Sequence, residues 1–302
     1  PLIISEVQEL LKGAILNTGV LFNTDRLSAQ ELCEYAASLE ELGIESLWLP
    51  ELFTRDPFAT AGFLLSQTKT LKIGTGIANI YVRDATATIS SASSLSELSD
   101  GRFVLGLGVS NAGLNQARGH QWEKPLGKLS RYLDDMKQVK LTCPQIETPI
   151  SVAAHGPKML EIAAQKADGA NTYLMPNEHV RFARNILGEG PSLNTMLFCL
   201  LDEDPASARA TARKAIAYYV SLDYYQRAWK QFGFTDSDFK EGGSDRLIDS
   251  VVCWGSDDQI FDRITKQFSL GATRVVVIPI GSKNKGHPDW DLLKKLKSGS
   301  NH

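Results

Sequence analysis

The segment SVAAHGPKMLEIAAQKADGA (151–170) places residues that could bind an anion where a strand meets a helix. A short apolar run ends at Ala154, Gly156 permits a tight turn or close approach to a ligand, and Pro157 suits a first helical position. The free N–H groups of a first helical turn attract negative charge, and Lys158 adds a cation. The pattern predicts a phosphate site, but it also fits an ordinary strand–turn–helix connection whose lysine points into water.

Other polar side chains stand directly after short apolar runs, where strands would end. They are Glu51, Arg55, Asn79, Arg83, Ser110, Asn111, Asn115, His155, Lys158 and Tyr173. The set has no cluster of carboxylates, which argues against a hydrolase that uses two acids, and the chain has no Gly-x-Ser-x-Gly elbow. Mostly neutral polar groups favour holding an organic cofactor over strong acid–base catalysis.

Composition excludes several classes of function. The chain has 302 residues with 43% hydrophobic content, enough for a large core, and its net charge of −3 offers no basic field for nucleic acid. The four cysteines form no Cys-x-x-Cys pair and the five histidines have no metal spacing, so we expect a reduced, cytoplasmic protein without a metal site. We find no signal-peptide pattern and no apolar run of about 18 residues, so we expect no membrane insertion.

Apolar runs of strand length alternate with helical segments along the chain. We expect strands at 13–17, 44–50, 71–77, 101–109, 149–154, 169–175, 194–201 and 273–280. We expect helices at 28–43, 56–68, 85–99, 125–139, 157–167, 177–187, 204–222 and 287–297. Ser28 with Glu31 forms a capping box, Asp56 precedes Pro57 as a cap, and Gly43 suits a helix end.

This alternation implies a parallel sheet. Eight such units predict an α/β fold, a closed (β/α)₈ TIM barrel that forms one domain over residues 1–302. Two further helices, expected in 242–255 and 256–271, form an insertion between strands seven and eight. The rival is a doubly wound open sheet, but that fold usually has fewer strands, and its nucleotide-binding form would carry a glycine-rich turn after the first strand.

Seven segments occur in an order typical of one family. They are LWLPE (47–51), LKIGTGIANIYVRD (71–84), SDGRFVLGLGVS (99–110), AAHGPKMLEIAAQKADGA (153–170), GFTDSDF (233–239), GGSDRLIDSVVCWG (242–255) and GATRVVVIPI (271–280). Together they resemble the luciferase-like monooxygenase superfamily, and within it the actinobacterial branch of oxidoreductases that use the deazaflavin coenzyme F420. The resemblance spans nearly the whole chain and implies the barrel independently of the strand pattern.

The resemblance implies which residues bind the cofactor. The loop that holds the phosphate of FMN or coenzyme F420 in this family corresponds to Ala154, His155, Gly156, Pro157, Lys158 and Met159. A cis peptide beneath the cofactor ring corresponds to Gly76–Ile77, which Ala78 and Asn79 follow. Gly108, Val109 and Ser110 correspond to backbone that approaches the cofactor, although the glycines of this strand could instead serve close packing. Glu51 corresponds to an acidic position near the ring; the alternatives are a solvated carboxylate or a partner of Arg55.

Two positions depart from the sugar-phosphate dehydrogenases of the superfamily. Leu52 stands where those enzymes use a histidine, and Asn111 stands where they use a glutamate. The segment VKLTCPQIETP (139–149) is also shorter than its family counterpart. These departures argue against the sugar-phosphate reaction and leave Asn111, His155 and Glu51 as candidate catalytic residues.

The resemblance implies an oxidoreductase that transfers a hydride between coenzyme F420 and an unidentified small organic substrate. One alternative is a monooxygenase that uses FMN and dioxygen. The other is a non-catalytic flavin- or deazaflavin-binding protein, since the acid–base pair of relatives is missing. We further expect a homodimer, with neither nucleic acid nor a membrane as partner.

Overall fold

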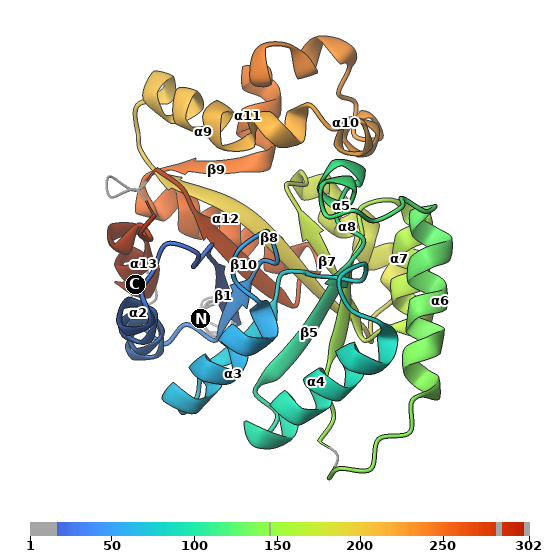
Figure 1. The fold of residues 1–302 in the computed structure, drawn as a ribbon. Helices are drawn as coiled ribbons and strands as arrows, with labels where there is room; N and C mark the ends of the chain where they lie inside the picture. Colours follow the sequence, from blue (N-terminus) through green and yellow to red (C-terminus); the bar gives the residue numbers. More distant parts are fainter. Residues whose placement is uncertain (1–16, 145, 282–285, 299–302) are drawn as a thin grey trace, which may run out of the picture.

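Parallel strands close into a barrel in the computed structural model, which describes residues 17–144, 146–281 and 286–298 (Figure 1). The barrel strands are β1 Thr18–Leu21, β2 Ser46–Leu49, β3 Lys72–Thr75, β5 Phe103–Gly108, β6 Ile150–Ala153, β7 Gly169–Tyr173, β8 Ser192–Leu201 and β10 Arg274–Pro279. Neighbours pair in chain order, and β10 closes the ring by pairing with both β8 and β1. The predicted (β/α)₈ barrel is confirmed.

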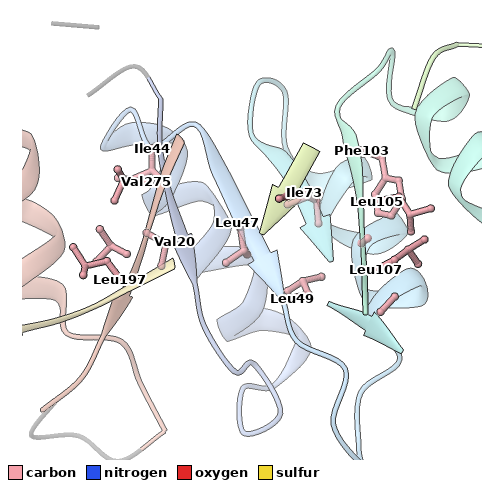
Figure 2. Close-up of a cluster of buried hydrophobic side chains, with 14 of the residues drawn as sticks. Val20, Ile44, Leu47, Leu49, Ile73, Phe103, Leu105, Leu107, Leu197 and Val275 are labelled. Atoms are coloured by element: carbon pink, nitrogen blue, oxygen red, sulfur yellow. The ribbon is translucent and has the colours of Figure 1, made fainter. Parts of the chain in front are cut away.

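Helices cover the outside of the barrel (Figure 1). They are α2 Ala29–Glu41, α3 Pro57–Gln67, α4 Ala85–Leu98, α6 Pro125–Gln138, α7 Pro157–Lys166, α8 Asn177–Leu187, α12 Asp257–Ser269 and α13 Trp290–Ser298. One face of each strand packs against these helices, and Figure 2 shows buried apolar side chains of this layer, among them Val20, Leu47 and Leu105. None of the helices in the described ranges is long and apolar enough to cross a membrane.

The helix boundaries follow the capping residues expected from the sequence. Ser28 accepts the N–H of Glu31 while the Glu31 carboxylate accepts the N–H of Ser28, so α2 begins with a full capping box. Asp56 accepts two N–H groups at the start of α3, with Pro57 at the first helical position. Gly43, with φ of 75°, follows the C-cap residue Leu42 of α2.

The first strand lies later than expected. Residues 13–16 of the expected strand 13–17 lie outside the described residues, and Asn17 is in a turn. The strand is Thr18–Leu21, whose residues pair with Val275–Val277 on one side and with 46–48 on the other. The run GVLF pairs with strands on both sides, and a local apolar pattern does not indicate such pairing.

The insertion between the seventh and eighth barrel strands differs from the expected pair of helices. It contains α9 Pro205–Val220, α10 Asp223–Lys230, the 3₁₀ helix Asp236–Gly242, α11 Asp245–Val251 and strand β9 Val252–Gly255 before α12. The expected helix over 242–255 is therefore wrong in its last four residues. They form a strand because β8 runs beyond β7, and its residues 198–201 offer a free edge that 252–255 pair with.

The ladder between β3 and β5 is interrupted where β3 ends. Gly74 pairs with Val104, and the ladder resumes only at the short strand β4, Ala78–Asn79. Between these points the Thr75 hydroxyl donates to the Gly106 carbonyl at 2.7 Å and accepts the Gly106 N–H at 2.9 Å. One side chain thus replaces the missing backbone bonds of Gly106.

Gly106→Ala should destabilise the barrel at this interruption. A Cβ there would lie 1.9 Å from the Thr75 carbonyl oxygen, a backbone atom with little freedom to move. We expect a loss of about 1–3 kcal/mol or more in the free energy of unfolding. The matched control is Gly190→Ala, whose Cβ would meet nothing within 4 Å. Urea unfolding measures both, and equal stability of the two variants would contradict the close approach.

Candidate functional site

The residues singled out in the sequence lie on one arc of the barrel rim. They follow β2 (Glu51), lie between β3 and β5 (76–79), and follow β5 (108–111) and β6 (154–159). These strands are neighbours: the Glu51 N–H donates to the Ile77 carbonyl at 3.3 Å, Asn79 pairs with Gly108, and Leu107 pairs with Val152. The carboxyl ends of the strands therefore bring all four groups to the same rim.

Glu51 is a buried structural carboxylate on this rim. It accepts the Asn79 N–H at 2.8 Å and a guanidinium N–H of Arg83 at 2.7 Å. Although burial lowers the pKa of Arg83, Glu51 and Asp56 raise it overall. Neither alternative for Glu51 holds, because the carboxylate is buried and Arg55 donates to backbone carbonyls of the β1–α2 loop instead.

Asn79 and Asn115 extend this network to the end of β5. The Asn79 amide donates to the Asn115 side-chain oxygen at 2.7 Å, and the Asn115 amide donates to the Val109 carbonyl at 2.8 Å. Both side chains are buried. Ser110, the next residue, has φ of 56°, so the chain turns sharply at the rim. Neutral amides thus hold the backbone of Val109 and Ser110 in place.

Asn111 has a structural role. Its side-chain oxygen accepts the Leu114 N–H at 2.9 Å and caps α5, Ala112–Ala117. This short helix was not expected from the sequence, and the Asn-x-x-Leu spacing after an apolar strand was the available signal. The cap commits one of the two polar atoms of the Asn111 amide.

The Gly76–Ile77 peptide bond is cis, as the resemblance implied. A Cβ on Gly76 would lie 2.9 Å from a methyl group of Leu21 and 3.3 Å from the Trp48 Cβ, so this glycine faces the barrel interior. A Cβ on Gly108 would lie 2.8 Å from the Ile77 side chain. Gly108 therefore leaves room for the Ile77 side chain beside the rim.

The N-terminus of α7 is where the sequence predicted an anion to bind. Gly156 is the cap residue and provides no side-chain acceptor, and Pro157 is the first helical residue. Met159 and Leu160 donate to the Gly156 carbonyl at 3.1 Å. Among the described residues, the N–H groups of Gly156 and Lys158 find no acceptor. Lys158 itself is exposed, so a cation and two free donors lie together.

His155 is held as a neutral imidazole. Its Nε2 accepts the Tyr173 N–H at 3.2 Å, which leaves the ring hydrogen on Nδ1. Burial, and to a smaller degree repulsion from His179, lowers its pKa to about 3. His179 lies behind it: its Nε2 is 2.7 Å from the His155 carbonyl, and burial lowers its pKa to about 4.

Aromatic residues from the insertion complete the site on the side of His155, and the sequence reasoning missed them. Tyr225 of α10 packs on the His155 ring at 5.1 Å, and Tyr219 of α9 packs on Tyr173 at 5.2 Å. Figure 1 shows α9, α10 and α11 grouped beyond one end of the barrel, beside α5. The available signal was the run YYVSLDYY (218–225), with four tyrosines in eight positions.

A surface cavity of about 510 Å³ lies beside this arc. It is lined by residues 80–84 of the loop after β4 and Ala85 of α4, by residues 120, 121 and 123, and by Lys128, Tyr132 and Asp135 of α6. Of the residues singled out from the sequence, Arg83 is the one that lines it, and none of the proposed catalytic or cofactor-binding residues does. In the described part of the chain, no group of three or more acidic, histidine or cysteine side chains could hold a metal ion.

Comparisons with known proteins agree with this geometry. The profile of the luciferase-like monooxygenase family matches residues 15–274. A 5,10-methylenetetrahydromethanopterin reductase of Methanolobus tindarius is 27% identical over 83% of this chain and 91% of its own.

Two solved structures share the fold. The coenzyme F420 dependent tetrahydromethanopterin reductase of Methanopyrus kandleri has a TM-score of 0.72 at 18% identity and covers 93% of this chain and 97% of its own. An F420-dependent secondary alcohol dehydrogenase in complex with an F420-acetone adduct has a TM-score of 0.72 at 14% identity, with the same coverage of 93% and 97%.

The buried histidines should make stability depend on pH. Below pH 6.5 His155 and His179 bind protons in the unfolded chain but stay neutral in the folded chain. The free energy of unfolding therefore falls as pH falls from about 6.5 toward 4. His179→Phe, whose ring fits beside Phe182 and Phe232, should reduce that slope by up to about 1.4 kcal/mol per pH unit. Urea unfolding at several pH values measures it. Plots of the unfolding free energy against pH should be parallel for the wild-type protein and the variant above pH 7. Plots that stay parallel down to pH 4.5 would refute the neutral His179.

Proposed function

The chain belongs to the luciferase-like monooxygenase family, and on that premise we propose that it is an oxidoreductase that moves a hydride between coenzyme F420 and a small organic substrate. The similarity to the two reductases and the alcohol dehydrogenase named above supports this proposal, because their names contain coenzyme F420 or methanopterin. The observation that carries it is that the N–H groups of Gly156 and Lys158, which have no acceptor among the described residues, lie on the same rim as the cis peptide Gly76–Ile77.

The residues of the rim fit such a cofactor. A phosphate needs donors and positive charge, which the N–H groups of Gly156 and Lys158 and the Lys158 ammonium supply. A flat ring needs an apolar support without bulk, which Ile77, Gly108 and Ala153 provide at the ends of three neighbouring strands. Coenzyme F420, when bound, supplies a deazaflavin ring that carries a hydride.

The chain's own contribution is to hold this rim still. The Glu51 carboxylate fixes the backbone at Asn79, and Asn115 fixes the carbonyl of Val109. Each of these side chains is buried and hydrogen-bonded, so its position is set before any ligand arrives. The proposed roles of Val109 and Ser110 toward the cofactor depend on this support.

None of the three candidate catalytic residues on the arc is a charged group that is free to transfer a proton. His155 is neutral at physiological pH and accepts a backbone N–H, so its Nδ1–H can donate a hydrogen bond without carrying charge. Glu51 is committed to Arg83 and Asn79, and Asn111 caps α5. The proposed reaction is therefore one in which orientation and exclusion of water around the hydride matter more than proton transfer.

The assembly and compartment are part of the same proposal. We propose a homodimer that acts on a small molecule in the cytoplasm, where thiols such as the buried Cys199 and Cys253 persist in reduced form. Light scattering tests the dimer directly, and a monomer at micromolar concentration would exclude it.

Lys158→Glu should weaken binding of coenzyme F420 by about tenfold or more. The substitution places a carboxylate at the helix N-terminus where the phosphate is proposed to bind, and it removes a charge-assisted hydrogen bond. The matched control is Lys137→Glu, which makes the same charge change at an exposed site in the last turn of α6 and should leave affinity unaltered.

The measurement is a titration of purified protein with coenzyme F420 and, in parallel, with FMN. The two titrations can be followed separately because oxidised deazaflavin and FMN absorb at different wavelengths. Tighter binding of FMN than of coenzyme F420 would favour the monooxygenase alternative. Equal F420 affinity in the wild-type protein and Lys158→Glu would remove the phosphate site from the proposal.

A further inference from the structure

Two tyrosine hydroxyls form a pair beside the proposed cofactor arc. The hydroxyl of Tyr173, at the end of β7, lies 2.9 Å from the hydroxyl of Tyr219 in α9. Tyr173 is tied to the arc because its N–H donates to the Nε2 of His155. Tyr173 and Tyr219 are each half-buried residues, at the boundary between the core and the surface.

The chemistry of this pair leaves one donor over. A phenol has one O–H to donate and two lone pairs, so in a pair one hydroxyl donates to the other and the second O–H remains available. Burial is the largest influence on the pKa of Tyr173 and of Tyr219 and raises both, so the two phenols stay protonated and neutral. The pair thus offers a ligand one O–H donor together with free oxygen lone pairs.

The surroundings of the pair are aromatic. The Phe198 ring of β8 lies 5.4 Å from the Tyr173 ring and 6.2 Å from the Tyr219 ring. Tyr225 lies 5.5 Å from Tyr219 and 5.1 Å from the His155 imidazole. A ligand here meets ring faces, neutral hydroxyls and a neutral imidazole, which suits an uncharged molecule with an apolar body and one oxygen.

We propose that the Tyr173–Tyr219 pair selects the substrate by hydrogen-bonding its single carbonyl or hydroxyl oxygen, and that the substrate is a small uncharged aromatic or alicyclic ketone, aldehyde or alcohol. This inference rests on the proposed hydride transfer and names the residues and substrate class of the same site. In the reducing direction, the carbonyl carbon gains the hydride with its electron pair and the oxygen gains a proton from solvent. The reduced deazaflavin is the reductant. A hydrogen bond to the oxygen favours this by stabilising the negative charge that develops there.

The insertion therefore has a role in specificity. Tyr219 belongs to α9, which lies outside the barrel, and α10 is fastened to the rim by the Trp229 indole N–H, which donates to the Leu174 carbonyl at 2.8 Å. A polar site built to bind one oxygen discriminates strongly against an analogue that lacks it, because its own donor is then left unpaired.

The test uses probes of one size that differ only in oxygen. Benzaldehyde, benzyl alcohol and toluene are titrated into the F420-loaded protein by calorimetry. The decisive variant is the double substitution Tyr173→Phe/Tyr219→Phe, because either tyrosine alone would keep a free O–H. Replacing both partners of a hydrogen bond by apolar groups of the same shape changes stability little. The matched control is Tyr218→Phe/Tyr224→Phe, which removes two hydroxyls from the more exposed neighbours.

We expect the wild-type protein and the control to bind benzaldehyde or benzyl alcohol at least tenfold more tightly than toluene. The double variant should keep its F420 affinity and lose most of that preference. A preference that is absent from the wild-type protein, or that survives in the double variant, would overturn the inference. The same titrations without cofactor separate the two proposals: no F420 binding with an intact oxygen preference would refute only the proposed function, whereas F420 binding without the preference would refute only this inference.

Discussion

The pairing of β10 with β8 closes the barrel, and the position of every residue on the rim depends on it. Six consecutive residue pairs, from Arg274 with Asn194 to Pro279 with Cys199, form this seam. Without it the sheet would be open, and β10 would keep β1 as its neighbour on one side but have none on the other. A closed ring allows one register for all strands, so the ends of strands that are far apart in sequence meet at fixed positions.

A polar network at the other end of the barrel supports the same seam. The Arg274 guanidinium donates to both oxygens of Glu45 and to the Asn194 side-chain oxygen, and the Asn194 amide donates to Asn171. Burial raises the pKa of Glu45, but Arg274 and Lys72 outweigh it and lower the pKa overall. Removing Glu45 would leave the largely buried Arg274 guanidinium without a carboxylate partner, which costs far more than the net worth of the pair. The network therefore links Glu45, next to β2, with residues of β7, β8 and β10.

The sequence predicted the parts of the structure that local rules determine. Caps such as Ser28 and Asp56 set helix starts correctly because a cap depends on residues within one turn. The turn at Gly156 and the helix that starts at Pro157 were predicted for the same reason. The first strand was placed too early and β9 was taken for helix, because both depend on which distant edge is free to pair.

The parts of the site that were missed are those that tertiary contacts create. Nothing near Glu51 in sequence indicates that its partner is Arg83, since both lie after different strands and meet only on the rim. The neutral state of His155 depends on Tyr173 and on its enclosure, which includes Tyr225.

The four-tyrosine run 218–225 looks like an ordinary helix surface until docking of the insertion brings Tyr219 against Tyr173. In the proposed site, the family pattern accounts for the half that the barrel strands build. The insertion supplies the other half, and its chemistry depends on packing that no local pattern encodes. If the proposed function holds, related barrels with other insertions keep the proposed cofactor rim and change the substrate, since the two halves lie on different elements and meet only in the folded chain.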